Sequence, residues 1–257
     1  MKAFILAAGL GTRLFPYTSD RPKALIELKG KTLLERAIRK VSELEISEII
    51  VNIHHFGDQI VTFLHENKNF GLPITISDER EFLLDTGGAI LKARHLLGDE
   101  EPFLLYNVDV LSTVNLSELL LFHIKSGGLA TLSVRKRETD RYLLFNHAML
   151  LSGWKNVKTG EEKFSRPNSD LNVLAFSGIQ IIQPEIFPLI TESGKFSLIQ
   201  LYLRLAQTEA IYGYFDASEL WMDLGKPDQL DAAKKIIGKL GNLAPADCKS
   251  AGGNLLE

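Results

Sequence analysis

The first hundred residues alternate between short apolar runs and segments whose apolar residues recur at helical spacing. The apolar runs, each of strand length, are residues 2–8, 48–53, 73–77 and 103–107. The helical patterns are residues 33–44, 57–67 and 88–97. Thr32 and Glu35 form a capping box at the start of the first helical pattern. This alternation predicts parallel strands joined by right-handed crossovers, with a ligand beyond the carboxyl ends of the strands.

The pattern changes after Val134. Two pairs of short strand-like runs follow, one pair around the turn Asn146-His147 and the other around Thr159-Gly160, and they predict a β-meander. The runs are residues 141–145, 149–151, 154–157 and 162–164. The chain then returns to α/β texture, with a strand, a helix, a strand and a final helix expected at residues 174–182, 197–207, 211–215 and 228–240.

The fold class predicted from this pattern is α/β. We expect a Rossmann-like mixed, mostly parallel sheet flanked by helices, with a small β-rich subregion that forms a lid or second half-site. Residues 1–240 are expected to form one domain, in which residues 137–220 include the meander. Residues 241–257 are polar and rich in small residues, so we expect a disordered tail.

Composition narrows the classes of partner and the cellular compartment. The chain has 257 residues, 45% of them hydrophobic, which is enough for a large core. Its formal net charge of −3 argues against binding to nucleic acid or to an anionic membrane. The single cysteine, Cys248, excludes an internal disulfide and fits a reducing compartment. No apolar stretch reaches membrane-spanning length, so we expect a cytoplasmic protein.

The loop after the first apolar run carries the strongest chemical signal. Gly9 and Gly11 follow a strand end, where a glycine turn exposes backbone N–H groups. Arg13 and Lys23 lie in the same loop and can meet a phosphate chain bound there. Leu14 stands where a dinucleotide fingerprint has its third glycine, and the chain has no Walker A sequence. The loop therefore predicts a nucleoside triphosphate site and disfavours an NAD-dependent dehydrogenase.

The run Leu6–Leu14, followed by Pro16, Thr18, Pro22-Lys23 and Leu25, resembles the signature of sugar-1-phosphate nucleotidyltransferases. In that family the loop wraps the triphosphate, and its arginine and lysine neutralise the phosphate charge. The resemblance implies a catalytic role for Arg13 and Lys23. It also implies nucleotide contacts at Leu6, Ala7, Ala8, Gly9, Gly11, Thr12, Arg13 and Lys23.

Three further stretches extend the resemblance over about 230 residues. Residues 85–89 are similar to the family's segment beside base and ribose, which implies nucleotide contacts at Gly87 and Gly88. A helix N-terminus capped by Thr86 is the alternative interpretation of that segment. The other two stretches, Asn107-Val108-Asp109 and residues 221–225, resemble the family's two metal-carboxylate segments.

The resemblance makes Asp109 and Asp223 the ligands of a divalent metal and adds Asn107 to the nucleotide contacts. Two carboxylates that leave room for water and phosphate oxygens suit Mg²⁺. Val108 departs from the family pattern, because a glycine usually stands there. A non-catalytic nucleotide-sugar sensor, with Val108 marking lost chemistry, is therefore a competing hypothesis.

The sugar side of the resemblance is carried by residues 176–179 and 196–198, which are similar to the branch acting on N-acetylmuramic acid 1-phosphate. This likeness implies sugar contacts at Arg141, Ser177 and Gly178. Mannose-1-phosphate guanylyltransferases share most of these sequences and remain the alternative.

The expected reaction joins a sugar 1-phosphate to a nucleoside triphosphate, with UTP favoured, and releases pyrophosphate. The phosphate of the sugar is already an anion at neutral pH, so no general base is needed. Base, sugar and oligomeric state stay open at the level of the sequence.

Overall fold

A computed structural model describes residues 1–166 and 170–240 of the chain. Its main sheet has the strand order β11-β10-β9-β12-β6-β1-β4-β5, and β8 and β13 join it beside β12. The predicted tail, residues 241–257 with Cys248, lies outside the described residues.

The strands of the first half form the parallel part of this sheet, as predicted. They are β1 (Lys2–Leu6), β4 (Glu48–Ile53), β5 (Ile74–Asp78) and β6 (Phe103–Asn107). β1 lies between β4 and β6, and β5 pairs with β4, all in parallel register. Ala3 and Ile5 belong to one hydrophobic cluster and Phe4 to the other, so β1 is buried on both faces. This two-sided burial explains why the parallel strands read as continuous apolar runs.

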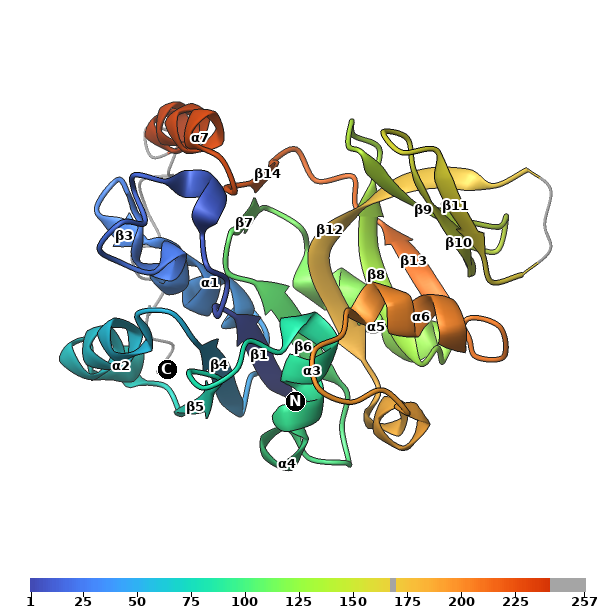
Figure 1. Cartoon of the computed structure of the whole chain (residues 1–257), viewed down its shortest axis with the longest axis horizontal. Coiled ribbons are helices and arrows are strands. Elements are labelled where there is room, and N and C mark those ends of the chain that lie inside the picture. The colour runs from blue at the N-terminus through green and yellow to red at the C-terminus, as the bar shows by residue number, and fades with distance from the viewer. Residues whose placement is uncertain (167–169, 241–257) are drawn as a thin grey trace, which may run out of the picture.

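The second half of the sheet is mixed. β12 (Asn172–Ile182) pairs antiparallel with β6 and with β8 (Ala130–Arg135), and β13 (Ile211–Phe215) runs parallel to β8. The first residues of β12 pair with β9 (Arg141–Phe145). Figure 1 shows β12 curving from the centre of the molecule towards the meander. One long strand therefore connects the parallel sheet to the β-rich subregion.

The predicted meander is present, but it has three strands where the sequence pattern indicated four short runs. β9, β10 (Leu151–Asn156) and β11 (Glu161–Phe164) follow one another in antiparallel register. The runs that the sequence pattern separated at residues 149–151 and 154–157 belong mostly to one strand, β10. A register shift between Leu151 and Gly153 interrupts the alternation, which is why the pattern looked like two strands.

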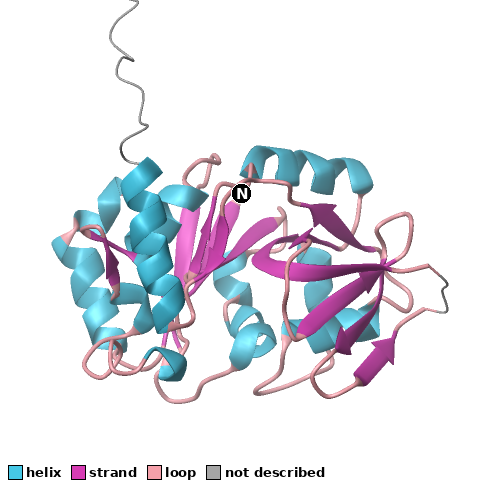
Figure 2. Cartoon of the chain, turned by 90° about the horizontal axis from the view of Figure 1, so that it is seen from above, coloured by secondary structure: helices cyan, strands magenta, loops and turns pink. Residues whose placement is uncertain are grey.

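Helices cover both sides of the sheet (Figure 2). They are α1 (Leu33–Val41), α2 (Gly57–Glu66), α3 (Asp85–Lys92), α4 (Arg94–Leu97), α5 (Leu116–Ser126), α6 (Leu198–Leu205) and α7 (Pro227–Leu240). The Thr32 hydroxyl accepts a hydrogen bond from the Glu35 N–H at 3.0 Å, as the capping box predicts. The single helix expected at residues 88–97 is instead α3 and α4, which meet at Ala93. Among the described residues, none of the helices combines the length and apolarity needed to cross a bilayer.

His123 in α5 makes the stability of the fold depend on pH. Its side chain is fully buried, and its Nδ1 lies 2.9 Å from the Thr131 hydroxyl of β8. Nε2 is buried without a hydrogen-bond partner. Burial lowers the pKa of His123 to about 4, because the imidazolium would lose its hydration.

We expect acid to destabilise the protein through His123. In the unfolded chain the His123 side chain takes up a proton near pH 6.5, whereas in the folded protein it does so only near pH 4. The free energy of unfolding therefore falls as the pH drops between these values. The loss from pH 7 to pH 5 amounts to about 2 kcal/mol. Urea unfolding of the wild type and of His123→Gln at both pH values measures it. An equal pH dependence in the two proteins would contradict this assignment.

Candidate active site

The loop after β1 is folded tightly onto Lys23. Gly11 has a φ of +67°, and a Cβ there would lie 2.8 Å from the methyl group of Thr18 and 3.3 Å from the Lys23 Cβ. The Thr18 hydroxyl donates to the Gly11 carbonyl at 3.0 Å. The positive φ and the close approach both require glycine at position 11. Gly11 therefore serves the shape of the loop that carries Arg13 and Lys23.

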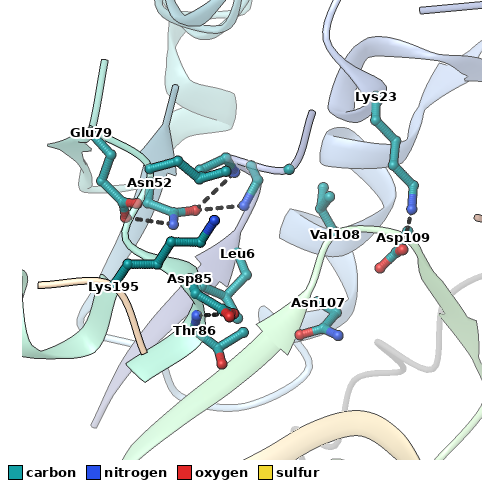
Figure 3. Close-up of a pocket in the computed structure, with 14 residues that line it drawn as sticks. Leu6, Lys23, Asn52, Glu79, Asp85, Thr86, Asn107, Val108, Asp109 and Lys195 are labelled. Carbon is teal, nitrogen blue, oxygen red and sulfur yellow. Dashed lines mark hydrogen bonds and ion pairs between the residues drawn. The ribbon is translucent and has the colours of Figure 1, made fainter. Parts of the chain in front are cut away.

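A cavity of about 360 Å³ lies at the carboxyl ends of β1 and β6 (Figure 3). Six of the residues expected to contact nucleotide line it: Leu6, Ala7, Ala8, Gly9, Lys23 and Asn107. The remaining lining residues are Asn52, Glu79, Leu83, Asp85, Thr86, Val108, Asp109 and Lys195. The other expected nucleotide contacts, Gly11, Thr12, Arg13, Gly87 and Gly88, are not among the lining residues.

A buried polar network that the sequence analysis missed holds one wall of this cavity. The Asn52 side-chain oxygen accepts hydrogen bonds from the backbone N–H groups of Ala7 at 2.6 Å and Ala8 at 3.1 Å. Its amide nitrogen donates to Glu79 at 2.7 Å. Two N–H groups of the glycine loop are thus already paired with Asn52 and are not free for phosphate. The only sequence feature that pointed to this network was the presence of a polar residue, Asn52, within the apolar run of β4.

Glu79, the residue that directly follows β5, anchors that network. Its side chain is 1% exposed, and its second oxygen accepts the Leu84 N–H at 3.3 Å. Burial raises the pKa of Glu79, opposed by its hydrogen bonds from Asn52 and Leu84. His54, which follows β4, forms a hydrogen bond through Nδ1 to the Glu79 carbonyl at 2.6 Å.

Asp109 and Asp223 are brought together by a short two-stranded sheet. β7 (Val110–Ser112) pairs antiparallel with β14 (Trp221–Asp223), and Asp223 lies opposite Val110. The Leu224 N–H donates to the Asp109 carbonyl at 2.8 Å. Two carboxylates more than a hundred residues apart in the sequence therefore lie close together. We call this place, where Asp109 lines the cavity, the corner.

The two cations of the loop reach this corner as well. Lys23 forms an ion pair with Asp109 (Figure 3), and its side chain is largely buried. A Cβ added to Gly225 would lie 2.8 Å from both the Arg13 guanidinium and the Asp223 carboxylate. Arg13 and Asp223 are thus neighbours across Gly225, which leaves room for both side chains.

The carboxylate pair fits a divalent cation. One oxygen of Asp223 is buried and has no hydrogen-bond partner. Burial and the charge of Asp109 raise the pKa of Asp223, while Lys23 and Arg13 oppose the shift. A cation between two such carboxylates relieves both the repulsion and the missing contact. Among the described residues, no cluster of three or more His, Cys, Asp or Glu side chains has metal-binding geometry, so water and phosphate would complete the shell.

Gly87 and Gly88 have a packing role that the sequence did not reveal. A Cβ on Gly87 would overlap the Phe196 ring, and one on Gly88 would overlap the Gly194 carbonyl oxygen. The Gly87 N–H donates to the Phe196 carbonyl at 2.9 Å. These contacts seat the loop before α6 against the start of α3 and bring Lys195 to the cavity. Thr86 does not cap its own helix: its hydroxyl accepts the Leu198 N–H at 3.0 Å.

We expect Gly88→Ala to disturb the packing of the loop before α6 against the start of α3. Because the added methyl group meets a backbone carbonyl that cannot rotate away, the variant should lose about 2 kcal/mol of stability. The displaced loop should also lower turnover at least tenfold. Urea unfolding and pyrophosphate release measure the two effects. Gly9→Ala is the control for stability, since its Cβ would meet nothing within 4 Å, and equal stability losses in both variants would contradict this explanation.

A second cavity of about 600 Å³ adjoins the first and shares Asp85, Thr86 and Asn107 with it. Arg141, one of the expected sugar contacts, lines it. The remaining lining residues are Arg137, Thr139, Tyr142, Leu143, Trp154, Asn156, Glu161, Phe176, Gln180, Ser197, Leu198, Ile199 and Gln200. Trp154 of β10 thus forms part of the wall of this cavity.

Ser177 and Gly178, the other two expected sugar contacts, lie behind the wall instead of on it. Ser177 is fully buried, and its carbonyl accepts the Trp221 indole N–H at 2.8 Å. Gly178 has a φ of +76°, and a Cβ there would lie 3.0 Å from the Asn107 amide nitrogen. These residues support Trp221 and Asn107 through close backbone packing.

The fold and this corner combine a mixed α/β sheet, a glycine loop that carries two cations, and a pair of carboxylates, as in an α/β enzyme that acts on nucleotides. Comparison with known proteins gives the family. The model of the family described as "Nucleotidyl transferase" matches residues 2–239. The chain is 33% identical to an N-acetylmuramate alpha-1-phosphate uridylyltransferase of Caulobacter vibrioides, over 92% of this chain and 97% of that protein. It is 29% identical to a rice protein named as a probable mannose-1-phosphate guanylyltransferase, over 100% of this chain and 71% of that protein.

Solved structures show the same fold. A UDP-glucose pyrophosphorylase from Acinetobacter baumannii superposes with a TM-score of 0.76 at 18% identity, over 94% of this chain and 97% of that chain. HddC from Yersinia pseudotuberculosis superposes with a TM-score of 0.72 at 21% identity, over 92% of this chain and 99% of that chain.

The chain belongs to the nucleotidyl transferase family, and it is a sugar-1-phosphate nucleotidyltransferase. Enzymes of this family typically use a divalent metal ion. The expectation drawn from the glycine loop and the two aspartate segments is thereby confirmed at the level of reaction class.

Proposed function

We propose that this enzyme transfers a uridylyl group from UTP to N-acetylmuramic acid 1-phosphate and releases pyrophosphate. The observation that carries the proposal is the pair of adjoining cavities, which share Asp85, Thr86 and Asn107. In this proposal the nucleotide occupies the first cavity, beside Lys23 and Asp109. The sugar phosphate occupies the second, within residues 137–220.

The choice of sugar rests on charge and on relationship. N-acetylmuramic acid carries a lactyl carboxylate besides its 1-phosphate, and the second cavity is lined by two arginines, Arg137 and Arg141. The uridylyltransferase relative is matched along 97% of its length, which supports the same substrate pair. Mannose 1-phosphate with GTP is the second candidate, supported by the likeness to the rice protein.

The proposed chemistry is an in-line displacement at the α-phosphorus of the nucleotide. An oxygen of the sugar phosphate forms the new P–O bond, and the bond to the bridging oxygen of pyrophosphate breaks. No proton is removed, because the second pKa of a phosphate monoester lies near 6. The barrier is mainly repulsion between anions and poor alignment, so positioned cations and two fixed half-sites lower it.

Each residue of the corner has a proposed role in this step. Asp109 and Asp223 would hold Mg²⁺, which supplies charge neutralisation at the phosphates when bound. Lys23 and Arg13 approach the same phosphates from the glycine loop. Asn52 fixes the backbone at Ala7 and Ala8, so the loop keeps its shape without nucleotide. All the nucleotide and sugar contacts expected from the sequence stay predictions, including those at Gly11, Thr12, Gly87, Gly88, Ser177 and Gly178, which do not line the cavities.

The departure at Val108 does not remove the corner. Val108 is 5% exposed, and its N–H donates to the Leu6 carbonyl at 3.2 Å, continuing the pairing of β6 with β1. Asp109 keeps its place beside Lys23. This arrangement favours an enzyme over a nucleotide-sugar sensor. A cytoplasmic location, expected from the sequence, completes the proposal.

A coupled assay of pyrophosphate release tests the function. UTP, GTP and dTTP are each combined with N-acetylmuramic acid 1-phosphate, N-acetylglucosamine 1-phosphate and mannose 1-phosphate. We expect the highest kcat/KM with UTP and N-acetylmuramic acid 1-phosphate, and no release without divalent metal. A preference for GTP and mannose 1-phosphate would select the second candidate, and nucleotide binding without release for any pair would favour the sensor.

A further inference from the structure

Arg137 is a half-buried cation that the sequence analysis did not assign. It follows β8, lines the second cavity, and forms no ion pair with a carboxylate among the described residues. Its guanidinium donates to two backbone carbonyls, those of Phe176 at 3.0 Å and Glu138 at 3.3 Å. Nε is buried without a partner. Guanidinium groups have five N–H donors, so further donors on its two terminal nitrogens remain.

The neighbours of Arg137 place it beside the carboxylate corner. Its guanidinium carbon lies 4.3 Å from the centre of the Trp221 ring. Trp221 and Asp223 are alternate residues of β14, so their side chains emerge on the same face of that strand. The charge of Asp223 acts on Arg137, whose pKa burial lowers. Arg137 therefore lies between the proposed metal corner and the second cavity.

Arg135 is a second arginine beside Trp221 and, within the part of the chain that the structure describes, differs from Arg137 in having a carboxylate partner. It also lies over Trp221, at 5.9 Å, but it is paired with the buried carboxylate of Asp216 and donates to the Ser218 carbonyl. Its charge is thus balanced within the protein. Within residues 1–166 and 170–240, Arg137 has no such carboxylate partner, and its two carbonyl hydrogen bonds and the Trp221 ring offset the desolvation of its charge only in part, so an anionic ligand would stabilise it further.

We propose that Arg137 binds the phosphate group of the sugar 1-phosphate and holds it for attack on the nucleotide. Any attacking phosphate must reach from the second cavity to the corner of Asp109 and Asp223, and Arg137 lies beside that route. Planar guanidinium groups suit a phosphate because they offer parallel N–H donors. Trp221, whose indole N–H donates to the Ser177 carbonyl, lies against the Arg137 guanidinium and limits its movement.

Steady-state kinetics of Arg137→Gln and Arg137→Lys test this assignment. KM is measured for the sugar 1-phosphate and for the nucleotide separately, with the substrate pair that the wild type turns over. We expect Arg137→Gln to raise KM for the sugar 1-phosphate about thirtyfold and to leave KM for the nucleotide within threefold. Arg137→Lys should recover only part of the loss, because an ammonium lacks the planar pair of donors.

Arg135→Gln is the matched control, since it removes a guanidinium from the same tryptophan. It should lower the melting temperature and leave both KM values within threefold. Equal rises in both KM values for Arg137→Gln, or a fall in kcat alone, would show that Arg137 only ties the backbone at Phe176 and would overturn the proposal.

Titration calorimetry covers a variant too slow to assay. N-acetylmuramic acid 1-phosphate and mannose 1-phosphate are each titrated into protein saturated with α,β-methylene UTP or the corresponding GTP analogue. Loss of heat in Arg137→Gln, but not in Arg135→Gln, supports the assignment, and wild-type affinity in Arg137→Gln overturns it. The inference rests on the sugar-1-phosphate reaction class. If the wild-type protein binds neither sugar 1-phosphate, both the proposed substrates and a phosphate site at Arg137 are contradicted. If binding is lost only in Arg137→Gln, the phosphate site is supported and the proposed substrates are retained.

Discussion

Asp223→Asn is expected to lower turnover about a thousandfold or more and, at the same time, to raise the melting temperature. Turnover falls because the neutral amide removes one of the two charges that would hold the metal. Stability rises because, without bound metal, the ionised Asp223 carboxylate destabilises the folded protein. Its pKa is raised by burial and by Asp109, so the folded state disfavours the charge that Asp223 carries at neutral pH.

Pyrophosphate release and thermal unfolding at pH 7, without added metal for the unfolding, measure the two effects. Asp216→Asn is the matched control: Asp216 is also buried, but it is paired with Arg135 outside both cavities. That variant should melt lower and retain most of its turnover. Wild-type turnover in a folded Asp223→Asn protein would end the assignment of Asp223 as a metal ligand.

Lys23→Met is expected to reduce kcat/KM for the nucleotide at least a hundredfold. The substitution keeps the apolar stem, which is buried beside Gly11, and removes the charge that faces the cavity. A positioned cation of this kind contributes about 3 kcal/mol or more to lowering the barrier of a phosphoryl transfer.

Initial rates at varied nucleotide concentration give this number. Lys2→Met serves as the control, because Lys2 also pairs with a carboxylate, Glu48, at the opposite end of β1. Its kcat/KM should stay within threefold of the wild type. A similarly small change in Lys23→Met would remove Lys23 from contact with the phosphates.

The parallel half of the sheet was predictable because its signals are local. Continuous apolar runs in β1, β4, β5 and β6 reflect burial on both faces, and the cap of α1 lies within four residues of sequence. β10 was misread because a register shift breaks its alternation. β7 and β14 have three residues each, too few for any periodicity, yet they bring the two aspartates together.

The residues that sequence reasoning missed depend on contacts between distant segments. Asn52 matters because its strand lies next to β1, so its side chain meets the backbone of Ala7 and Ala8. Arg137 matters because Trp221 of β14, a strand far away in the sequence, packs against its guanidinium. Gly87 and Gly88 matter because the loop before α6 packs on them. A sequence pattern records which residue types are present, and such pairings across the fold are invisible to it.

The sequence by itself determined the parallel core, since strand burial and capping are encoded between near neighbours, and the family resemblance of its long contiguous loop gave the reaction class. The residues expected to meet a polyphosphate stay predictions. Tertiary structure alone decided which of those residues lie close together, which glycines serve packing, and that Arg137 lines the second cavity with no carboxylate partner among the described residues. The physical reason is that strand pairing and side-chain burial are set by segments a hundred or more residues apart, whose approach becomes defined only when the chain has folded.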